Sequence, residues 1–252
     1  MNSLFRKLRV DILSNNKIGR YLAYAIGEVL LIVIGIMIAV QLSNLNEQRR
    51  AADLERAYLE RIASEMRSNV AMFSGDRETA SAAQRVIERF SAALNDLSAP
   101  DAELGQATVD YFDTGWIFPD FDPTTTTFDD LEATGNLQVI RNNQVRQAMI
   151  ELYANYEAYW RDLDSNVSWG LPVDARLTYE YDALRWDPRT AVLFQELTPG
   201  EAASDIRSHA DILNRSAAIH FWVMDYTLRD YEEAIAHSES VLEKVEAELA
   251  KH

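Results

Sequence analysis

The residue types that bind metal ions occur here in two short arrangements. Asp120 and Asp122 alternate as the first ligands of a calcium loop do, and Glu233 and His237 lie one helical turn apart, as zinc ligands can. The first arrangement lacks the glycine and the later glutamate of a calcium loop, and the second has no further ligand cluster nearby. A solvated acidic loop and a surface helix pair explain these residues better, so we expect no metal ion.

The chain also carries none of the motifs that usually mark a catalytic or cofactor site. It has no nucleophile elbow, no phosphate-binding loop, no dinucleotide glycine fingerprint and no cysteine. Lys and Arg total 24 against 40 Asp and Glu, and a net charge of -16 argues against nucleic acid, whose phosphates require basic surfaces. We therefore expect a protein that is not an enzyme, holds no cofactor and binds no nucleic acid.

The elements that must position any site begin with an apolar segment near the N-terminus. Between residues 21 and 40 the only charge is Glu28, and Val29 to Val40 is unbroken apolar sequence. Because about 20 apolar helical residues span the ~30 Å hydrocarbon core of a bilayer, this segment predicts a transmembrane helix. The predicted organisation is a basic tail (1–20), a transmembrane helix (21–45) and an acidic helical extramembrane domain (46–252).

The charges in front of this helix predict its orientation. Residues 1–20 contain Arg6, Lys7, Arg9, Lys17 and Arg20 against the single acid Asp11. A short basic tail before a first span stays in the cytoplasm, so we expect a cytoplasmic N-terminus and the domain on the opposite side. A cleaved signal peptide is the alternative, but no small-x-small cleavage pattern follows Val40, which favours an uncleaved anchor.

Three residues of the predicted membrane helix form a candidate helix–helix interface: Glu28, Gly35 and Ala39. Gly35 and Ala39 are a small-xxx-small pair that lets another helix approach closely, and Glu28 lies two turns earlier on nearly the same side. An ionisable group in hydrocarbon costs about 2.5 to 3.5 kcal/mol, which favours a specific contact, although Glu28 near the headgroups could instead reach water. The expected partners are the lipid bilayer and other membrane subunits or a second copy of the chain.

Two heptad patterns predict an all-α fold. After the apolar segment, apolar residues recur every seven positions, and a second set of apolar residues lies three positions after the first. The repeat continues without a shift across Ser74, Gly75 and Asp76. We expect the transmembrane helix to continue into one long helix, packed in a membrane-proximal helical bundle against a long C-terminal helix that begins at Thr198 and Pro199 and has a heptad pattern of its own. The first row is Leu45, Ala52, Leu59, Met66, Phe73, Ala80, Ile87 and Leu94, and the second Ile62, Ala83, Phe90 and Leu97; the C-terminal rows are Phe221, Leu228, Ile235, Leu242 and Leu249, and Met224, Tyr231, Ser238 and Val245.

The middle of the chain is acidic and aromatic. Residues 90–140 contain ten acids and no Lys or Arg, with too many aromatic residues for simple disorder. We expect short helices near 103–114 and from Thr127, a stop at Gly135, a helix from Asn142 or Asn143 to about Asn166, and a short helix near 172–184. Aromatic residues of this region and the helix after it are a candidate partner surface, although core packing explains their helical spacing at least as well. They are Trp116, Phe118, Phe121, Tyr153, Tyr156 and Trp160.

Two passages, residues 24–47 and 127–146, resemble the signature segments of an uncharacterised bacterial family of single-pass membrane proteins, a domain-of-unknown-function family with an N-terminal anchor and a helical domain. The first includes Glu28, Gly35 and Glu47, and the second includes Gly135 and Asn142. Leu45 departs from the pattern, where members often have tryptophan. The resemblance implies the bacterial inner membrane, with a periplasmic domain if the orientation above holds, and it brings no known activity.

The sequence thus favours a noncatalytic, membrane-anchored interaction or scaffolding protein, such as an accessory subunit of a larger membrane complex. A ligand-sensing domain that signals through a partner is the second interpretation, because helical bundles beside a membrane suit that task. An enzyme is the third.

Overall fold

The computed structural model describes residues 17–251, and throughout that range it contains helices and connecting segments but no strand. The all-α prediction is confirmed. The chain divides into two compact units, residues 1–55 and 56–252, which are described separately below.

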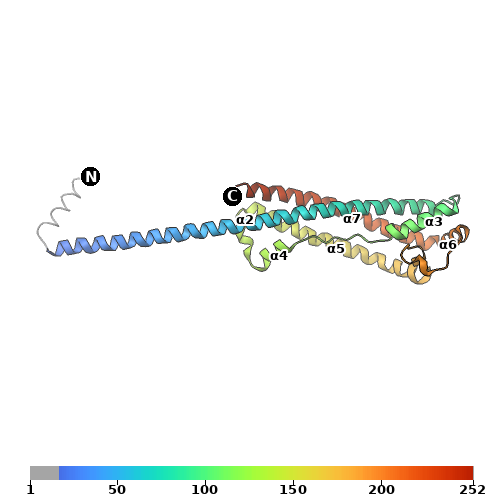
Figure 1. The fold of residues 1–252 in the computed structure, drawn as a ribbon, viewed down its shortest axis with the longest axis horizontal. Coiled ribbons are helices and arrows are strands. Elements are labelled where there is room, and N and C mark those ends of the chain that lie inside the picture. The colour runs from blue at the N-terminus through green and yellow to red at the C-terminus, as the bar shows by residue number, and fades with distance from the viewer. Residues whose placement is uncertain (1–16, 252) are drawn as a thin grey trace. The chain divides into compact units, whose positions relative to one another are not determined.

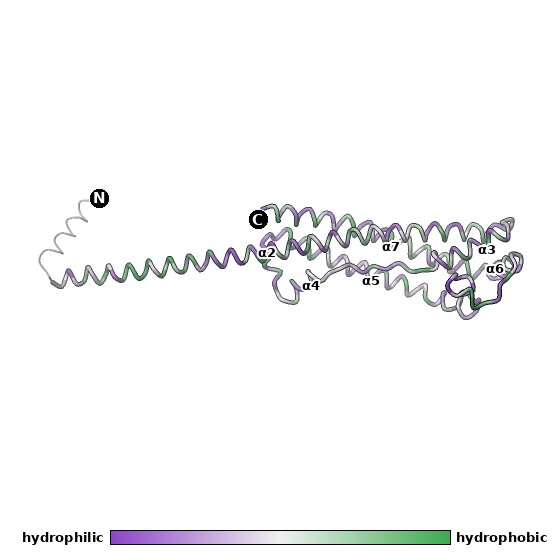
Figure 2. The backbone as a smooth tube through the Cα atoms, in the orientation of Figure 1, coloured by the Kyte–Doolittle hydropathy of each residue, from purple (hydrophilic) through white to green (hydrophobic). Residues whose placement is uncertain are grey.

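Helix α2 (Lys17–Asn95) passes through Ser74, Gly75 and Asp76 without a break, so the predicted continuity is confirmed. In the first unit its apolar side chains are exposed: Leu31 is 72% exposed and Met37 is 60% exposed. Figure 2 shows the hydrophobic residues concentrated in this N-terminal part of the helix. Over the part of the chain that is described, α2 is the one helix long and apolar enough to cross a membrane, a test that a signal sequence also passes.

The second unit contains the remaining helices (Figure 1). Three of its helices, the C-terminal part of α2 together with α5 and α7, are long, and the others are short connectors. In chain order after α2 they are α3 (Asp101–Asp110), η1 (Tyr111–Gly115), α4 (Thr126–Ala133), η2 (Asn136–Val139), α5 (Asn143–Glu180), η3 (Ala183–Arg185), η4 (Ala191–Leu193), α6 (Pro199–Ser208) and α7 (Ala210–Leu249).

Local sequence explains most of the helix ends. Asn142 caps α5 by accepting hydrogen bonds from the backbone N–H groups of Gln144 (3.0 Å) and Val145 (3.4 Å), and Thr198 and Glu201 form the predicted capping box of α6. Gly135 follows α4 with φ +70°, a left-handed conformation that favours glycine. These predictions from cap spacing are confirmed.

Two helix boundaries differ from the prediction. Helix α5 does not stop near Asn166 but continues through Pro172 to Glu180, because tertiary packing that buries Gly170 and Leu177 outweighs the single backbone hydrogen bond that proline removes. The C-terminal segment is not one helix. It breaks at His209, whose Nδ1 lies 2.9 Å from the carbonyl oxygen of Asp205 and whose ring packs against Tyr181 at 4.5 Å.

The directions of the long helices follow from which residues meet. Contacts of α2 with α7 pair Phe73 with Tyr231 and Asn95 with Asn214, so residue numbers rise along one helix as they fall along the other and the helices are antiparallel. The α5–α7 contacts, Tyr156 with Ser238 among them, are antiparallel as well. Helices α2 and α5 are therefore parallel, and residues 96–142 must return along the bundle between them.

Much of that return path is an extended segment, residues 116–125, which we call the strap. Phe121 inserts into the core from the strap and stacks on Phe73 of α2 (4.8 Å between ring centroids) and on Tyr231 of α7 (6.0 Å), with Tyr156 and Tyr159 of α5 edge-on to it. The bundle is thus an up-down-up-down arrangement in which an extended strap followed by short α4 takes the place of the second long helix.

The heptad rows are partly correct. On α2 the row from Leu59 to Leu94 is buried, but Leu45 is 49% exposed, and Leu97, which follows the end of α2, is 86% exposed. On α7 the row of Met224, Tyr231, Ser238 and Val245 is buried, as predicted. The row that begins at Phe221 packs against the core, but at its edge, where those side chains are half-buried. The second row that is buried on α7 includes polar and small residues and consists of His220, Thr227, Ala234 and Val241.

Candidate functional site

The strap is held by side chains that satisfy its backbone. The amide of Asn69 on α2 donates to the carbonyl oxygen of Thr124 and accepts from its N–H group, both at 2.9 Å. From α7, Tyr231 donates to the carbonyl oxygen of Asp120, and His220 Nδ1 lies 3.0 Å from that of Ile117. A buried backbone that forms no helix or sheet needs such partners, so these polar core residues fix the position of the strap.

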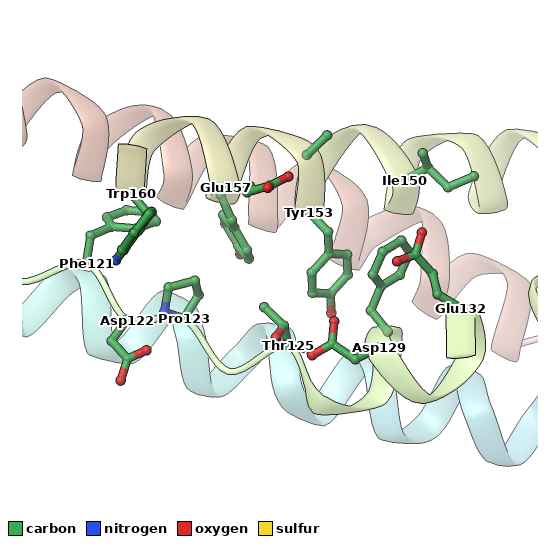
Figure 3. A pocket seen from close by; sticks show the side chains of 13 residues that line it. Phe121, Asp122, Pro123, Thr125, Asp129, Glu132, Ile150, Tyr153, Glu157 and Trp160 are labelled. Atoms are coloured by element: carbon green, nitrogen blue, oxygen red, sulfur yellow. Dashed lines mark hydrogen bonds between the residues drawn. The ribbon is translucent and has the colours of Figure 1, made fainter. Parts of the chain in front are cut away.

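Between the strap, α4 and α5 the surface is hollowed into a pocket of about 520 Å³ (Figure 3). Figure 3 shows Phe121 and Trp160 at one end of the pocket and Tyr153, Asp129 and Glu132 toward the other. The lining residues are Phe121, Asp122, Pro123, Thr125, Phe128, Asp129, Glu132, Ile150, Tyr153, Ala154, Tyr156, Glu157 and Trp160. We call this the acidic aromatic pocket.

The aromatic wall of the pocket is rigid. Tyr153 stacks on Phe128 with ring centroids 4.2 Å apart, and its hydroxyl donates to Glu65 Oε1 at 2.6 Å. Burial, followed by the neighbouring Glu65 carboxylate, raises the pKa of Tyr153 well above its ordinary value, so the hydroxyl stays a donor. Glu65 Oε2 also accepts from the N–H of Thr127 at 2.8 Å, in the first turn of α4, so one buried carboxylate orients the α4 and α5 walls.

The rim of the pocket carries four carboxylates: Asp122, Asp129, Glu132 and Glu157, all on exposed residues. None of the four forms an ion pair with a Lys or Arg among residues 17–251, and none of the residues that line the pocket is basic. Asp129 accepts a hydrogen bond from Thr125 Oγ1 at 2.8 Å. The pocket therefore presents aromatic surface inside and negative charge outside.

The predicted partner surface is corrected by these positions. Phe121, Tyr153 and Tyr156 are 1%, 6% and 1% exposed, so they are core residues whose edges form the pocket wall rather than a free surface. Sequence spacing could not decide this, because core and interface aromatics share the same helical period. Trp160 is 53% exposed and lies at the pocket, so it alone of these residues offers a large exposed aromatic surface there.

Trp116 and Phe118 lie instead in a second polar cluster, around Asp174. Trp116 Nε1 donates to Asp174 Oδ1 at 2.7 Å, and both carboxylate oxygens lie 3.1 Å from His220 Nε2. Phe118 stacks on the His220 ring, with the ring centroids 4.4 Å apart. A Cβ atom added to Gly170 would lie only 2.4 Å from Cζ of Phe118. Glycine at position 170 is therefore required for Phe118 to pack against α5.

The His220 ring faces two acceptors, the Asp174 carboxylate and the Ile117 carbonyl. Nε2 meets both oxygens of the Asp174 carboxylate, whose side chain is 17% exposed, and Nδ1 meets the backbone carbonyl of Ile117. The cluster ties the strap, α5 and α7 together.

Ser216, His220 and Asp174 include the residue types of a hydrolytic triad, but they are connected differently. Ser216 Oγ bonds to Tyr111 (2.7 Å) and to Asp174 (3.4 Å), whereas the His220 ring is taken up by Asp174 and Ile117. A triad needs a histidine that can take the serine proton and a hydroxyl that a substrate can reach. Ser216 is fully buried, so this cluster has a structural role.

The other sequence candidates lie apart from the pocket or on its margin. Glu28, Gly35 and Ala39 lie on α2 in the first unit and are exposed, with open space where a Cβ on Gly35 would stand. Asp120 Oδ1 accepts from the N–H of Phe121, and Tyr159 OH meets both Glu233 and His237. Within residues 17–251 no three metal-binding side chains gather.

These features describe a class of protein: an all-α bundle whose first helix begins in an exposed apolar segment. Comparisons of the chain with protein-family models, with curated proteins and with solved structures found no match.

Proposed function

We propose that this protein is a noncatalytic interaction module anchored in the bacterial inner membrane, an accessory subunit that stabilises a larger membrane complex. The observation that carries the proposal is the long helix α2, whose apolar segment has no buried residue in the described structure and whose C-terminal part supplies a main row of the bundle core. Exposed apolar surface of that length is stable in a bilayer and unfavourable in water.

A bundle joined to such an anchor is suited to holding a partner rather than to chemistry. Three of its buried polar groups, Asn69, Glu65 and His220, are engaged in positioning the strap and α4. The basic tail supports a cytoplasmic N-terminus and a periplasmic bundle. The anchor supports contact with another membrane helix through Glu28, Gly35 and Ala39.

The first test is extraction of native membranes with alkaline carbonate and with high salt. A chain anchored by hydrophobic insertion remains in the membrane fraction through both treatments. Release by salt alone would contradict the anchor. Orientation is tested in intact cells by a cysteine introduced at exposed Ser204 in this cysteine-free chain, which an impermeant reagent labels if the bundle is periplasmic.

The second test is co-purification from native membranes in mild detergent, where an accessory subunit brings a stoichiometric partner. The double variant Glu28→Leu, Gly35→Leu is expected to weaken association about tenfold or more while the chain still inserts, because helix packing and hydrogen bonds in a bilayer contribute about 0.6 to 2 kcal/mol each. Val29→Leu is the matched control within the same helix. Equal recovery of partner with all three chains would leave the anchor a passive tether.

A further inference from the structure

We propose that the acidic aromatic pocket binds a lysine or arginine side chain presented by the partner protein. This inference rests on the proposed function, since it names the kind of surface that the partner brings. It starts from the pocket between the strap, α4 and α5, with its aromatic wall and unpaired carboxylate rim.

The aromatic wall suits the head of a cationic side chain. Cations bind over the faces of Trp, Tyr and Phe rings, with Trp the best of the three. Trp160 is the lining aromatic with most of its surface free, at 53% exposure, and Phe121 lies at the same end of the pocket in Figure 3. The walls do not have to rearrange, because Tyr153 and Phe121 are fixed by the contacts with Glu65 and Phe73.

The rim supplies the charge complementarity. Asp122, Asp129, Glu132 and Glu157 lack ion-pair partners among the described residues, in contrast to Asp130 and Asp101 nearby in sequence, which pair with Arg61 and Arg207. The surrounding sequence adds no positive charge between residues 90 and 140. A negative field of this kind attracts a cationic partner and repels nucleic acid and anionic lipid.

The geometry favours a side chain on a protein over a bare metal ion. Divalent cations need several oxygens converging on one point. In Figure 3 the carboxylates are instead spread around the rim, and the side chain of Asp122 extends away from α5. A lysine or arginine side chain has an apolar stem that lies along an aromatic wall while its charged head meets the carboxylates. A pocket of about 520 Å³ is large enough to admit it together with a neighbouring residue.

The test is a calorimetric titration of the full chain in mild detergent with the peptide acetyl-Arg-Leu-Arg-amide. Its citrulline counterpart, which has the same shape without the charge, is the matched ligand control. We expect millimolar or tighter binding of the arginine peptide, at least about tenfold weaker binding of the citrulline peptide, and loss of affinity as salt rises. Equal binding of the two peptides, or no binding of the arginine peptide at millimolar concentration, would overturn the proposal.

Variants locate the binding on the chain. Trp160→Ala and Glu157→Gln are each expected to weaken arginine-peptide binding about three- to tenfold, and Trp160→Phe is expected to retain part of it. The controls are Trp169→Ala, on the same helix outside the pocket and 69% exposed, and Glu239→Gln on the exposed face of α7. Equal weakening by a control and by its matched pocket variant would place the binding elsewhere. Binding of tetramethylammonium in preference to the peptide would assign the pocket to a small ligand and overturn the protein-partner proposal.

Failure of this inference can be told apart from failure of the interaction module. If a partner co-purifies equally with wild type and with the Trp160→Ala, Glu157→Gln double variant, the module stands and the pocket proposal falls. If the arginine peptide binds at the pocket but no protein co-purifies, the cation site stands and the accessory-subunit proposal falls.

Discussion

Glu65 and Asp174 are both carboxylates removed from most solvent inside the bundle, but they are compensated in different ways. Glu65 is 7% exposed and accepts from neutral donors, the hydroxyl of Tyr153 and the N–H of Thr127. Asp174 faces His220, with further donors from Trp116 and Ser216. Both sites organise the backbone around the strap, one at α4 and the other at Ile117.

The two carboxylates therefore differ in how much each depends on a single residue. The Thr127 N–H that Glu65 accepts belongs to the first turn of α4, where unpaired backbone N–H groups and the helix dipole stabilise a negative charge, so no side-chain cation is needed. Asp174 has side-chain partners instead, on Trp116, Ser216 and His220. A buried carboxylate is costly to leave without such a partner.

The largest expected effect is that of His220→Leu. It removes the side chain that meets both the Asp174 carboxylate and the Ile117 carbonyl, and each buried polar group left without a partner costs about 1 to 3 kcal/mol. We expect the free energy of unfolding to fall by about 3 kcal/mol, because two groups lose a partner while Asp174 keeps some solvent contact. The measurement is chemical denaturation of the full chain in mild detergent.

The double variant His220→Leu, Asp174→Asn sharpens this prediction. Removal of the stranded charge is expected to restore part of the lost stability, so the double variant is more stable than the sum of the single changes predicts. Strict additivity would mean that the two side chains do not interact in the way their 3.1 Å contacts indicate.

A smaller loss, about 1 to 2 kcal/mol, is expected for Glu65→Gln. The amide keeps one acceptor oxygen, but it loses the negative charge that pairs with the α4 N-terminus, and its NH₂ group can only donate where the carboxylate accepted a hydrogen bond. Denaturation under the same conditions measures it, with exposed Glu239→Gln as the control. A loss as large as that of His220→Leu would remove the proposed distinction between the two carboxylates.

The smallest effect concerns Asp230, a carboxylate with neither kind of compensation. Burial, followed by the nearby charges of Asp162 and Glu233, raises the pKa of Asp230 from 3.8 to about 6. Between these values the folded chain binds more protons than the unfolded chain, so the stability contributed by this group falls as pH rises. Asp230→Asn is therefore expected to stabilise the protein near neutral pH, by about 1 kcal/mol once solvent screening is allowed for.

The measurement for Asp230 is the free energy of unfolding against pH for wild type and variant. The curves should coincide below a pH of about 4, diverge between about 4 and 6, and keep a constant separation above about 6. Parallel curves over this window would show that Asp230 has an ordinary pKa.

Sequence patterns predicted the helices better than the contacts between them. Cap residues such as Asn142 and Thr198 act through neighbours in the chain, so their spacing was enough. The α7 row containing His220 and Thr227 does not appear in the pattern of apolar residues because both side chains are polar, and His220 is buried where it meets a strap residue 103 positions earlier in the sequence. The ends of α5 and α6 differ from the prediction for a related reason, since packing decides that α5 continues through Pro172 and that α6 ends at Ser208 without a proline or glycine after it.

The sequence shows which residues the pocket contains but does not show that they come together. The sequence contains Trp160 and the acids, but nothing in it indicates that the strap runs beside α5 and brings Phe121 and Asp122 near Trp160 and Glu157. This arrangement depends on Asn69, a polar residue of α2 that bonds to the backbone of Thr124, 55 residues later in the sequence.

The strap also imposes an order on biosynthesis. Its bonds to His220 and Tyr231 join residues 103 and 111 positions apart, so during translation the strap leaves the ribosome long before α7 exists to receive it. Contacts between residues that are distant in sequence form late, because closing the long loop between them costs conformational entropy. Until then the nascent chain displays Phe118 and Phe121 without their ring partners on α7, and an aromatic segment in that state is a substrate for chaperones and a starting point for aggregation. Chains truncated before residue 220 should therefore be recovered bound to chaperones or as aggregates, however well their first helices form.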